Sequence, residues 1–108
     1  MIVAGREVVF KAAFLDDLSK FEQYIGRFTA AKGHAFTGAV FDFCIDIIAP
    51  QPLAFPKFEQ ENFNDPAIRR AVFKRHYVLI YRIYADAIRF VTLYHAHQHP
   101  PDLLTLDY

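Results

Sequence analysis

The sequence predicts a single α+β domain over residues 1–108, with the order strand, helix, helix and three strands. Apolar residues recur at helical spacing through residues 12–28 and again up to Pro50, which predicts a helical hairpin. After Pro66 the chain changes to runs of β-branched and aromatic residues separated by short turns, which predicts an antiparallel meander. Both helices have an apolar side to bury, so the hairpin is expected to pack on one face of an antiparallel-rich sheet.

The front half begins with a short strand over Glu7–Lys11, followed by a helix over Ala12–Phe28. Asp16 and Asp17 are expected in the first turn of that helix, where the helix dipole favours negative charge. The apolar stripe of the helix consists of Phe14, Leu18, Phe21, Ile25 and Phe28.

A second helix is expected from Thr29, a suitable N-cap, up to Pro50 and Pro52. Gly33 and Gly38 weaken a helix by about 1 kcal/mol each relative to Ala. Their presence predicts close packing against the first helix.

A proline-bearing connector follows over Leu53–Pro66, and three phenylalanines are expected to pin it to the body: Phe55, Phe58 and Phe63. The strands are then predicted at Ile68–Phe73, His76–Tyr84 and Ala87–His95. The tail from Pro100 is expected to be loose.

Composition and charge narrow the class of protein. Hydrophobic residues make up 54% of the chain, which excludes a disordered protein and leaves apolar surface for a partner. The formal net charge is +0, but the arginines and lysines after Ala67 make the back half basic. No signal peptide or membrane span is predicted, and the lone Cys44 suits a reducing compartment, so we expect a cytoplasmic protein.

The predicted hairpin over residues 76–95 is apolar on both faces. Val78, Ile80 and Arg82 share one side of the middle strand, while Tyr81 lies on the other. Helices can cover only one face, so the second would present aliphatic, aromatic and guanidinium groups, a mixture enriched at binding hot spots. We therefore expect this face to bind a partner; the alternative is that the connector covers it.

The same residues resemble the C-terminal half of RelE/ParE-type toxins of type II toxin–antitoxin (plasmid stabilisation) systems. The motifs are Ile68-Arg69, then Tyr77-Val78-Leu79-Ile80-Tyr81-Arg82-Ile83, then Ile88 to Leu93 and His95. The stretch AFLDDLSKFEQYI resembles the first helix of the family, and the likeness covers roughly residues 7 to 100.

The resemblance implies a toxin neutralised by an antitoxin on its exposed sheet face. RelE-like members cleave mRNA on the ribosome, whereas ParE-like members inhibit DNA gyrase and are not nucleases. Positions where RelE-like enzymes carry catalytic basic residues align here with Ala71, Val78 and Gln98. The resemblance is therefore closer to ParE, which leans against an enzyme. A homodimer without toxicity is a further alternative.

The candidate residues follow from these interpretations. Partner binding is assigned to Arg69, Val78, Ile80, Tyr81, Arg82 and Arg89. For RNA cleavage the candidates are His95, His97, Arg69 and Arg75, with Arg70 and Lys74 as further cations. His95, His97 and His99 alternate along the last strand, and alternate residues of a strand share a face, but no acid or cysteine is placed to complete a zinc site. No metal and no cofactor are predicted.

Overall fold

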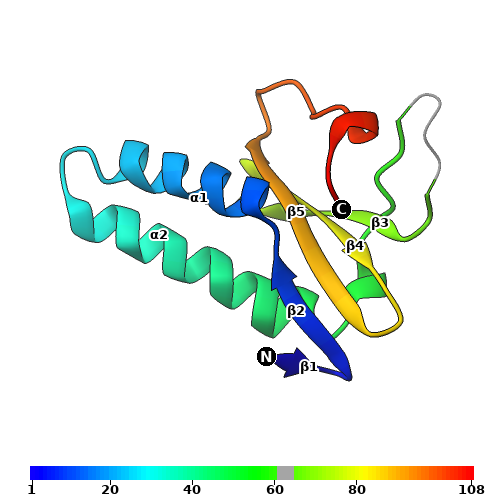
Figure 1. The fold of residues 1–108 in the computed structure, drawn as a ribbon. Coiled ribbons are helices and arrows are strands. Elements are labelled where there is room, and N and C mark those ends of the chain that lie inside the picture. Colours follow the sequence, from blue (N-terminus) through cyan, green and yellow to red (C-terminus); the bar gives the residue numbers. More distant parts are fainter. Residues whose placement is uncertain (61–64) are drawn as a thin grey trace.

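The structure is a computed structural model that describes residues 1–60 and 65–108. Two helices pack against a sheet with the strand order β1-β2-β5-β4-β3 (Figure 1). The strands are β1 (Ile2–Val3), β2 (Arg6–Phe10), β3 (Ile68–Phe73), β4 (Tyr77–Ile83) and β5 (Ala87–His95). The predicted fold class is confirmed.

The N-terminal hairpin was not predicted in full. β1 pairs antiparallel with β2 through a turn in which Ala4 and Gly5 have φ values of 49° and 82°. A two-residue turn with both φ values positive matches the twist of the paired strands. β2 then runs parallel to β5, and the helical hairpin provides the crossover that parallel pairing requires.

The helices are α1 (Ala12–Ile25) and α2 (Ala30–Asp42), and the second continues through a π-helical segment over Phe43–Ile48. The first helix is therefore shorter than predicted and ends at Ile25, with Gly26 as its C-cap, while the expected N-cap position of Thr29 is correct. None of the helices in the described part of the chain is long and apolar enough to cross a bilayer.

The two glycines of α2 have different surroundings. A Cβ on Gly33 would lie 2.5 Å from the backbone oxygen of Glu22, so this glycine permits close contact with α1. A Cβ on Gly38 would have no neighbour within 4 Å. The packing predicted for Gly33 is confirmed, and the same prediction for Gly38 is wrong.

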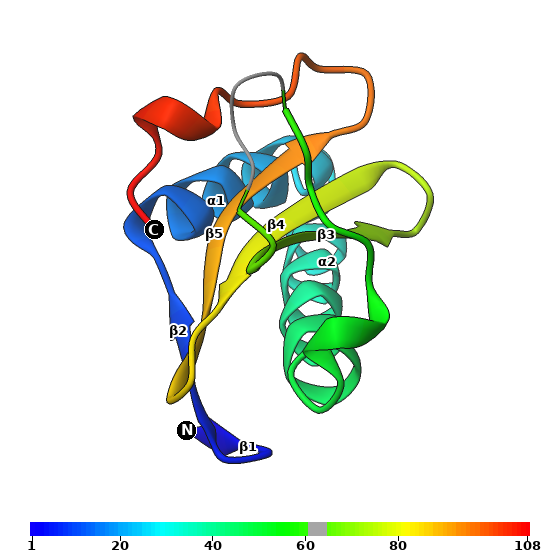
Figure 2. The ribbon, with the colours of Figure 1, turned by 90° about the vertical axis from the view of Figure 1, so that its right-hand side faces the viewer.

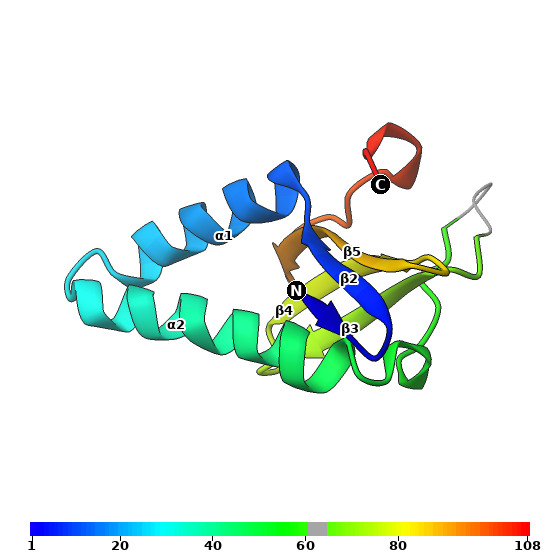
Figure 3. The same cartoon turned by 60° about the horizontal axis from the view of Figure 1, so that its bottom comes forward.

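The main core lies between the helices and one face of the sheet, as Figure 3 shows from below. Alternate residues of β4 point into it, including Leu79 and Tyr81. The remaining buried residues of this core come from both helices, the π-helical segment and the residue after it, β3 and β5: Phe14, Leu18, Phe36, Val40, Cys44, Ile48, Ala49, Ala71, Phe73, Ile88, Phe90 and Leu93.

The last three strands form the predicted antiparallel meander. In its register Ala71 lies opposite Leu79, and Leu79 lies opposite Leu93. A register shift falls between Ile80 and Tyr81, and beyond it Arg82 pairs with Arg89. The two arginines therefore lie side by side on adjacent strands.

The face of the sheet away from the helices is not open. Phe58 of the connector and Leu106 and Tyr108 of the C-terminal tail pack on it, and the helices lie behind the sheet (Figure 2). Phe58 is buried and Phe55 packs against the ring of Tyr81 at 6.5 Å, so two of the three predicted pins are confirmed. Phe63 lies outside the described residues. The tail forms a short 3-10 turn over Leu103–Thr105, where a loose end was expected.

Candidate partner-binding surface

A small second core fills the sheet face opposite the helices. Its buried members are Phe58, Ile68, Val78 and Ile80, and the partly buried side chains packed against them are Tyr94, Leu106 and Tyr108. We call this face, with the two arginines at its end, the tail face. The expectation that it lies exposed is wrong, because the connector and the tail bury its apolar residues.

Two arginines mark the end of the tail face. The guanidinium carbons of Arg82 and Arg89 lie 4.7 Å and 4.4 Å from the ring centre of Tyr84, so one aromatic ring holds both cations. Arg82 also forms an ion pair with Asp65 at 2.9 Å. Its hydrogen bonds with Tyr84 and Asp65 raise the pKa of Arg82 against the opposing effect of burial.

The tail is bound to this arginine pair. Arg89 donates from Nη1 to the main-chain oxygen of Tyr108 at 3.0 Å, and the guanidinium of Arg82 lies 6.0 Å from the Tyr108 ring. Lys11, which is partly buried, forms an ion pair at 3.2 Å with the exposed Asp107. An acidic, aromatic segment of the chain itself therefore occupies the site predicted for a partner.

Two other predicted partner residues belong to the helix side. Tyr81 is fully buried in the main core and donates its hydroxyl to the carbonyl oxygen of Pro52 at 2.6 Å. Arg69 donates to the carbonyl oxygens of Phe55 at 2.8 Å and Pro66 at 3.2 Å. Both side chains fasten the connector, and Tyr81 has no surface to offer a partner.

The positions aligned with RelE-like catalytic residues do not converge. Ala71 is buried in the main core, whereas Val78 is buried on the tail face. Gln98 lies in the exposed turn after β5, where its Oε1 accepts from the amide of His95 at 2.8 Å. Ala71 and Val78 therefore lie on opposite faces of the sheet, and Gln98 lies in a turn outside it.

The predicted acid–base candidates are partly brought together. The ring of His95 is stacked with those of His76 and His97, with centres 5.9 Å and 5.1 Å away, and it meets the ring of Tyr77 edge to face. The amide of His97 donates to Nδ1 of His95 at 3.2 Å. The sequence reasoning missed His76, which the β3–β4 turn places beside the end of β5.

Other members of that set lie apart. Arg75 is in the β3–β4 turn with a φ of 68°, near the imidazoles, but Arg69 pairs with Tyr81 further along β4. The strand ends at His95, so His99 lies on the irregular chain beyond it and faces a different site. Among the described residues, no group of His, Cys, Asp or Glu is arranged to hold a metal ion.

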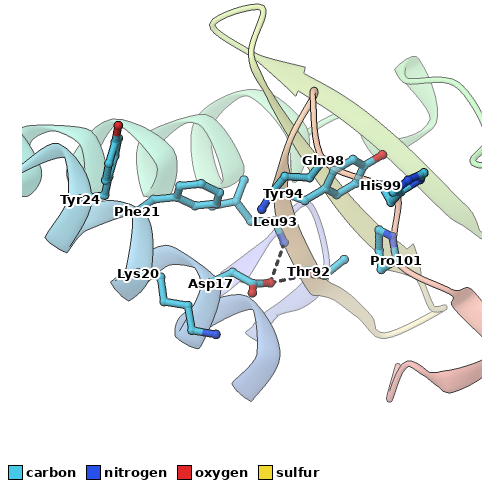
Figure 4. Close-up of a pocket in the computed structure, with 10 residues that line it drawn as sticks. All are labelled: Asp17, Lys20, Phe21, Tyr24, Thr92, Leu93, Tyr94, Gln98, His99 and Pro101. Atoms are coloured by element: carbon cyan, nitrogen blue, oxygen red, sulfur yellow. Dashed lines mark hydrogen bonds between the residues drawn. The ribbon is translucent and has the colours of Figure 1, made fainter.

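A cleft of about 400 Å³ lies between α1 and the end of β5 (Figure 4). We call it the α1 cleft. One wall is α1, with Asp17, Lys20, Phe21 and Tyr24, and the other is formed by residues 92–94, 98, 99 and 101. Sequence reasoning missed this cleft because its walls are distant in the chain.

Asp17 connects the two walls of the α1 cleft. Its Oδ2 accepts from the hydroxyl of Thr92 at 2.7 Å and from the amide of Leu93 at 3.2 Å. β2 pairs with β5 only up to Phe90, so the Leu93 amide would otherwise lie on an unpaired edge. The predicted place of Asp17 in the first turn is wrong, as is that of Asp16, because α1 begins at Ala12.

Comparisons with known proteins agree with this architecture. The family model described as the ParE toxin of type II toxin–antitoxin system, parDE, matches residues 8–100. No curated protein matches the sequence.

A solved structure shares the fold. It is the chromosomal ParDE TA system from P. aeruginosa, with a TM-score of 0.66 and 10% sequence identity over 84% of this chain and 96% of that chain. The matched family segment begins in β2 and ends past β5, so it contains both helices and the whole meander. The chain therefore belongs to the ParE toxin family of type II toxin–antitoxin systems.

Proposed function

We propose that this chain arrests growth by binding a protein target in the cytoplasm, and that an antitoxin neutralises it by occupying the tail face. The resemblance to ParE-like toxins makes DNA gyrase the first target to test. The single observation that carries the antitoxin site is the tail itself, an acidic and apolar segment seated on an arginine pair and an apolar cluster.

The tail makes contacts that another segment can reproduce. They include Leu106 and Tyr108 at the small core, hydrogen bonds from Arg89 and Gln60, and an ion pair between Lys11 and the exposed Asp107. An ion pair to a solvent-exposed carboxylate contributes about 1 kcal/mol or less. An antitoxin segment with a carboxylate and a leucine or aromatic side chain can make the same contacts over a longer stretch, and it would take the tail's place.

The experiment is expression of the chain alone and together with the small reading frame beside its gene. We expect growth arrest in the first case and rescue in the second, and inhibition of supercoiling when the purified chain is added to gyrase. Normal growth on expression alone would refute the proposal.

A second candidate function rests on the stacked imidazoles. His76, His95 and His97 lie beside the cationic turn of Lys74 and Arg75, and message cleavage needs acid–base groups next to phosphate-binding cations. Primer extension on message from expressing cells separates the two functions. Codon-linked cuts would favour cleavage, and intact message with inhibited gyrase would favour the first proposal.

A further inference from the structure

The tip of the helical hairpin carries an exposed group of aromatic and cationic side chains. Phe28 is 88% exposed and Tyr24 is 64% exposed, although both are large apolar rings. The guanidinium carbon of Arg27 lies 4.0 Å from the centre of the Tyr24 ring and 4.8 Å from that of Phe28. We call these three residues the tip sandwich. Tyrosine and arginine are the side chains that dominate binding hot spots.

The tip sandwich is held in a defined place. Arg27 donates from Nη1 to the carbonyl oxygen of Tyr24 at 2.6 Å, which fixes its side chain along the end of α1. Below it the helices are in close contact, because a Cβ on Gly26 would lie 3.4 Å from the Cα of Gly33 on α2. The tip projects away from the sheet and the tail (Figures 1 and 3). A preorganised group of this kind loses little conformational entropy on binding.

Tyr24 joins the tip sandwich to the α1 cleft. It is also a wall residue of the cleft, next to Phe21, whose ring points across toward Leu93 (Figure 4). The two features therefore form one continuous surface, with a concave apolar part and a protruding aromatic part. Such a surface can receive a side chain in the cleft while the tip contacts the flanking chain.

The charges on this surface favour an acidic partner. Glu22 is paired with His34 at 2.7 Å, and Asp17 is engaged by Thr92 and Leu93. Arg27 has no ion pair with the described residues, and Lys20 stands exposed at the rim. A carboxylate brought to the rim can pair with these two cations, and it would reach Arg27 at the tip, away from the carboxylate of Asp17 inside the cleft.

The tail forms part of the same cleft. Its opposite wall includes His99 and Pro101, and the carbonyl oxygen of Pro101 accepts a hydrogen bond from Gln60 at 2.7 Å. Residues 101–108 continue from this wall onto the tail face. A partner that displaces the tail from that face therefore also moves the part of this wall that Pro101 forms, while the part formed by β5 stays in place.

We propose that the α1 cleft and the tip sandwich together bind the protein target, through an acidic segment that inserts one apolar side chain into the cleft. This inference rests on the proposed function. It adds the site that binds the target, the acidic and apolar chemistry of the bound segment, and a link between antitoxin binding and target binding. An antitoxin on the tail face disrupts target binding by moving the cleft wall, without having to cover the tip.

The test compares Arg27→Glu and Phe28→Ser with Leu15→Ser as the matched control. Leu15 is 43% exposed on the same helix, and it lies about two and a half turns before Tyr24, on the opposite side. For each variant the melting temperature, growth arrest on expression, inhibition of supercoiling by purified DNA gyrase and rescue by the neighbouring small gene are measured. A labelled single-stranded RNA is included as a probe of the same surface.

We expect both tip variants to fold normally and to be rescued normally, but to need roughly 30-fold more protein for the same arrest or inhibition, the loss typical of a hot-spot side chain. The control should act like the unchanged chain. Full activity of both tip variants would overturn the inference while leaving the proposed function intact. RNA binding that depends on Phe28 would also overturn it, in favour of a nucleic-acid partner. An unchanged chain that does not arrest growth would remove both.

Discussion

Removing the hydroxyl of Tyr81 separates a core role for this residue from a partner-binding role. Tyr81→Phe keeps the ring and its contacts with Phe55 and Phe90, and deletes only the donor to Pro52. The carbonyl oxygen of Pro52 is buried there, and in the variant it has no hydrogen-bond donor from β4. Leaving one buried group unsatisfied costs about 1–3 kcal/mol, so we expect a loss of about 2 kcal/mol.

That loss can be measured by unfolding. With a urea m-value of about 2 kcal/mol/M, 2 kcal/mol moves the midpoint down by roughly 1 M. The melting temperature should fall by about 10 °C in a domain of this size. Far-UV circular dichroism is the suitable signal, because the chain has no tryptophan whose fluorescence could report unfolding. Tyr24→Phe is the matched control, since it deletes the same group from a largely exposed ring and should change stability by less than about 0.5 kcal/mol.

The same variant has a predicted pH signature. Burial raises the pKa of Tyr81 above its ordinary value, and the nearby charge of Arg69 only partly opposes this. The unfolded phenol ionises near pH 10, so the stability linked to the protonated native phenol is complete below that pH and is lost as pH rises. Stability should fall less steeply above about pH 10 in Tyr81→Phe. Equal midpoints for the variant and the unchanged chain would refute the core role.

Two further predictions concern the helices. Gly33→Ala should lower the free energy of unfolding by about 1–3 kcal/mol in urea titrations, because the added methyl group meets the backbone of α1. Gly38→Ala should raise it by up to about 1 kcal/mol, because alanine has the higher helix propensity and the site is open. The reverse order of stabilities would contradict the helix packing. Cys44 is buried, and burial raises the pKa of its thiol, so a thiol reagent should label it only when the chain unfolds. The stability linked to the protonated thiol should be lost as pH rises above about 9. Rapid labelling of the folded chain would contradict this prediction.

Much of the fold could be predicted from local pattern. The period of the apolar residues placed α1, α2 and the three strands of the meander close to their observed bounds, and Pro50 correctly marked the end of the second helix. β1 was missed because two residues give no period to detect. The parallel pairing of β2 with β5 depends on which edge strand the crossover reaches, and no local pattern carries that information.

The binding surface was harder to predict. Alternation correctly placed Val78 and Ile80 on one face and Tyr81 on the other, but it could not say what covers the first face. The cover comes from the connector and from residues 101–108, whose composition resembles that of a loose tail. The α1 cleft depends on the hydrogen bond between Asp17 and Thr92, which lie 75 residues apart in the sequence. No local pattern in either segment predicts this contact.

In the proposed function, the tail occupies the place on the sheet that an antitoxin takes in the complex. Amide hydrogen exchange in the chain alone, and in its complex with the product of the neighbouring small gene, shows whether the tail leaves that place. In the free chain the amides of Leu104 and Thr105 are bonded within the tail to Asp102, at 3.0 Å and 3.1 Å. We expect both amides to exchange faster in the complex while the strands of the tail face become more protected. A tail that keeps its protection, with new protection confined to other parts of the molecule, would show that the antitoxin binds elsewhere.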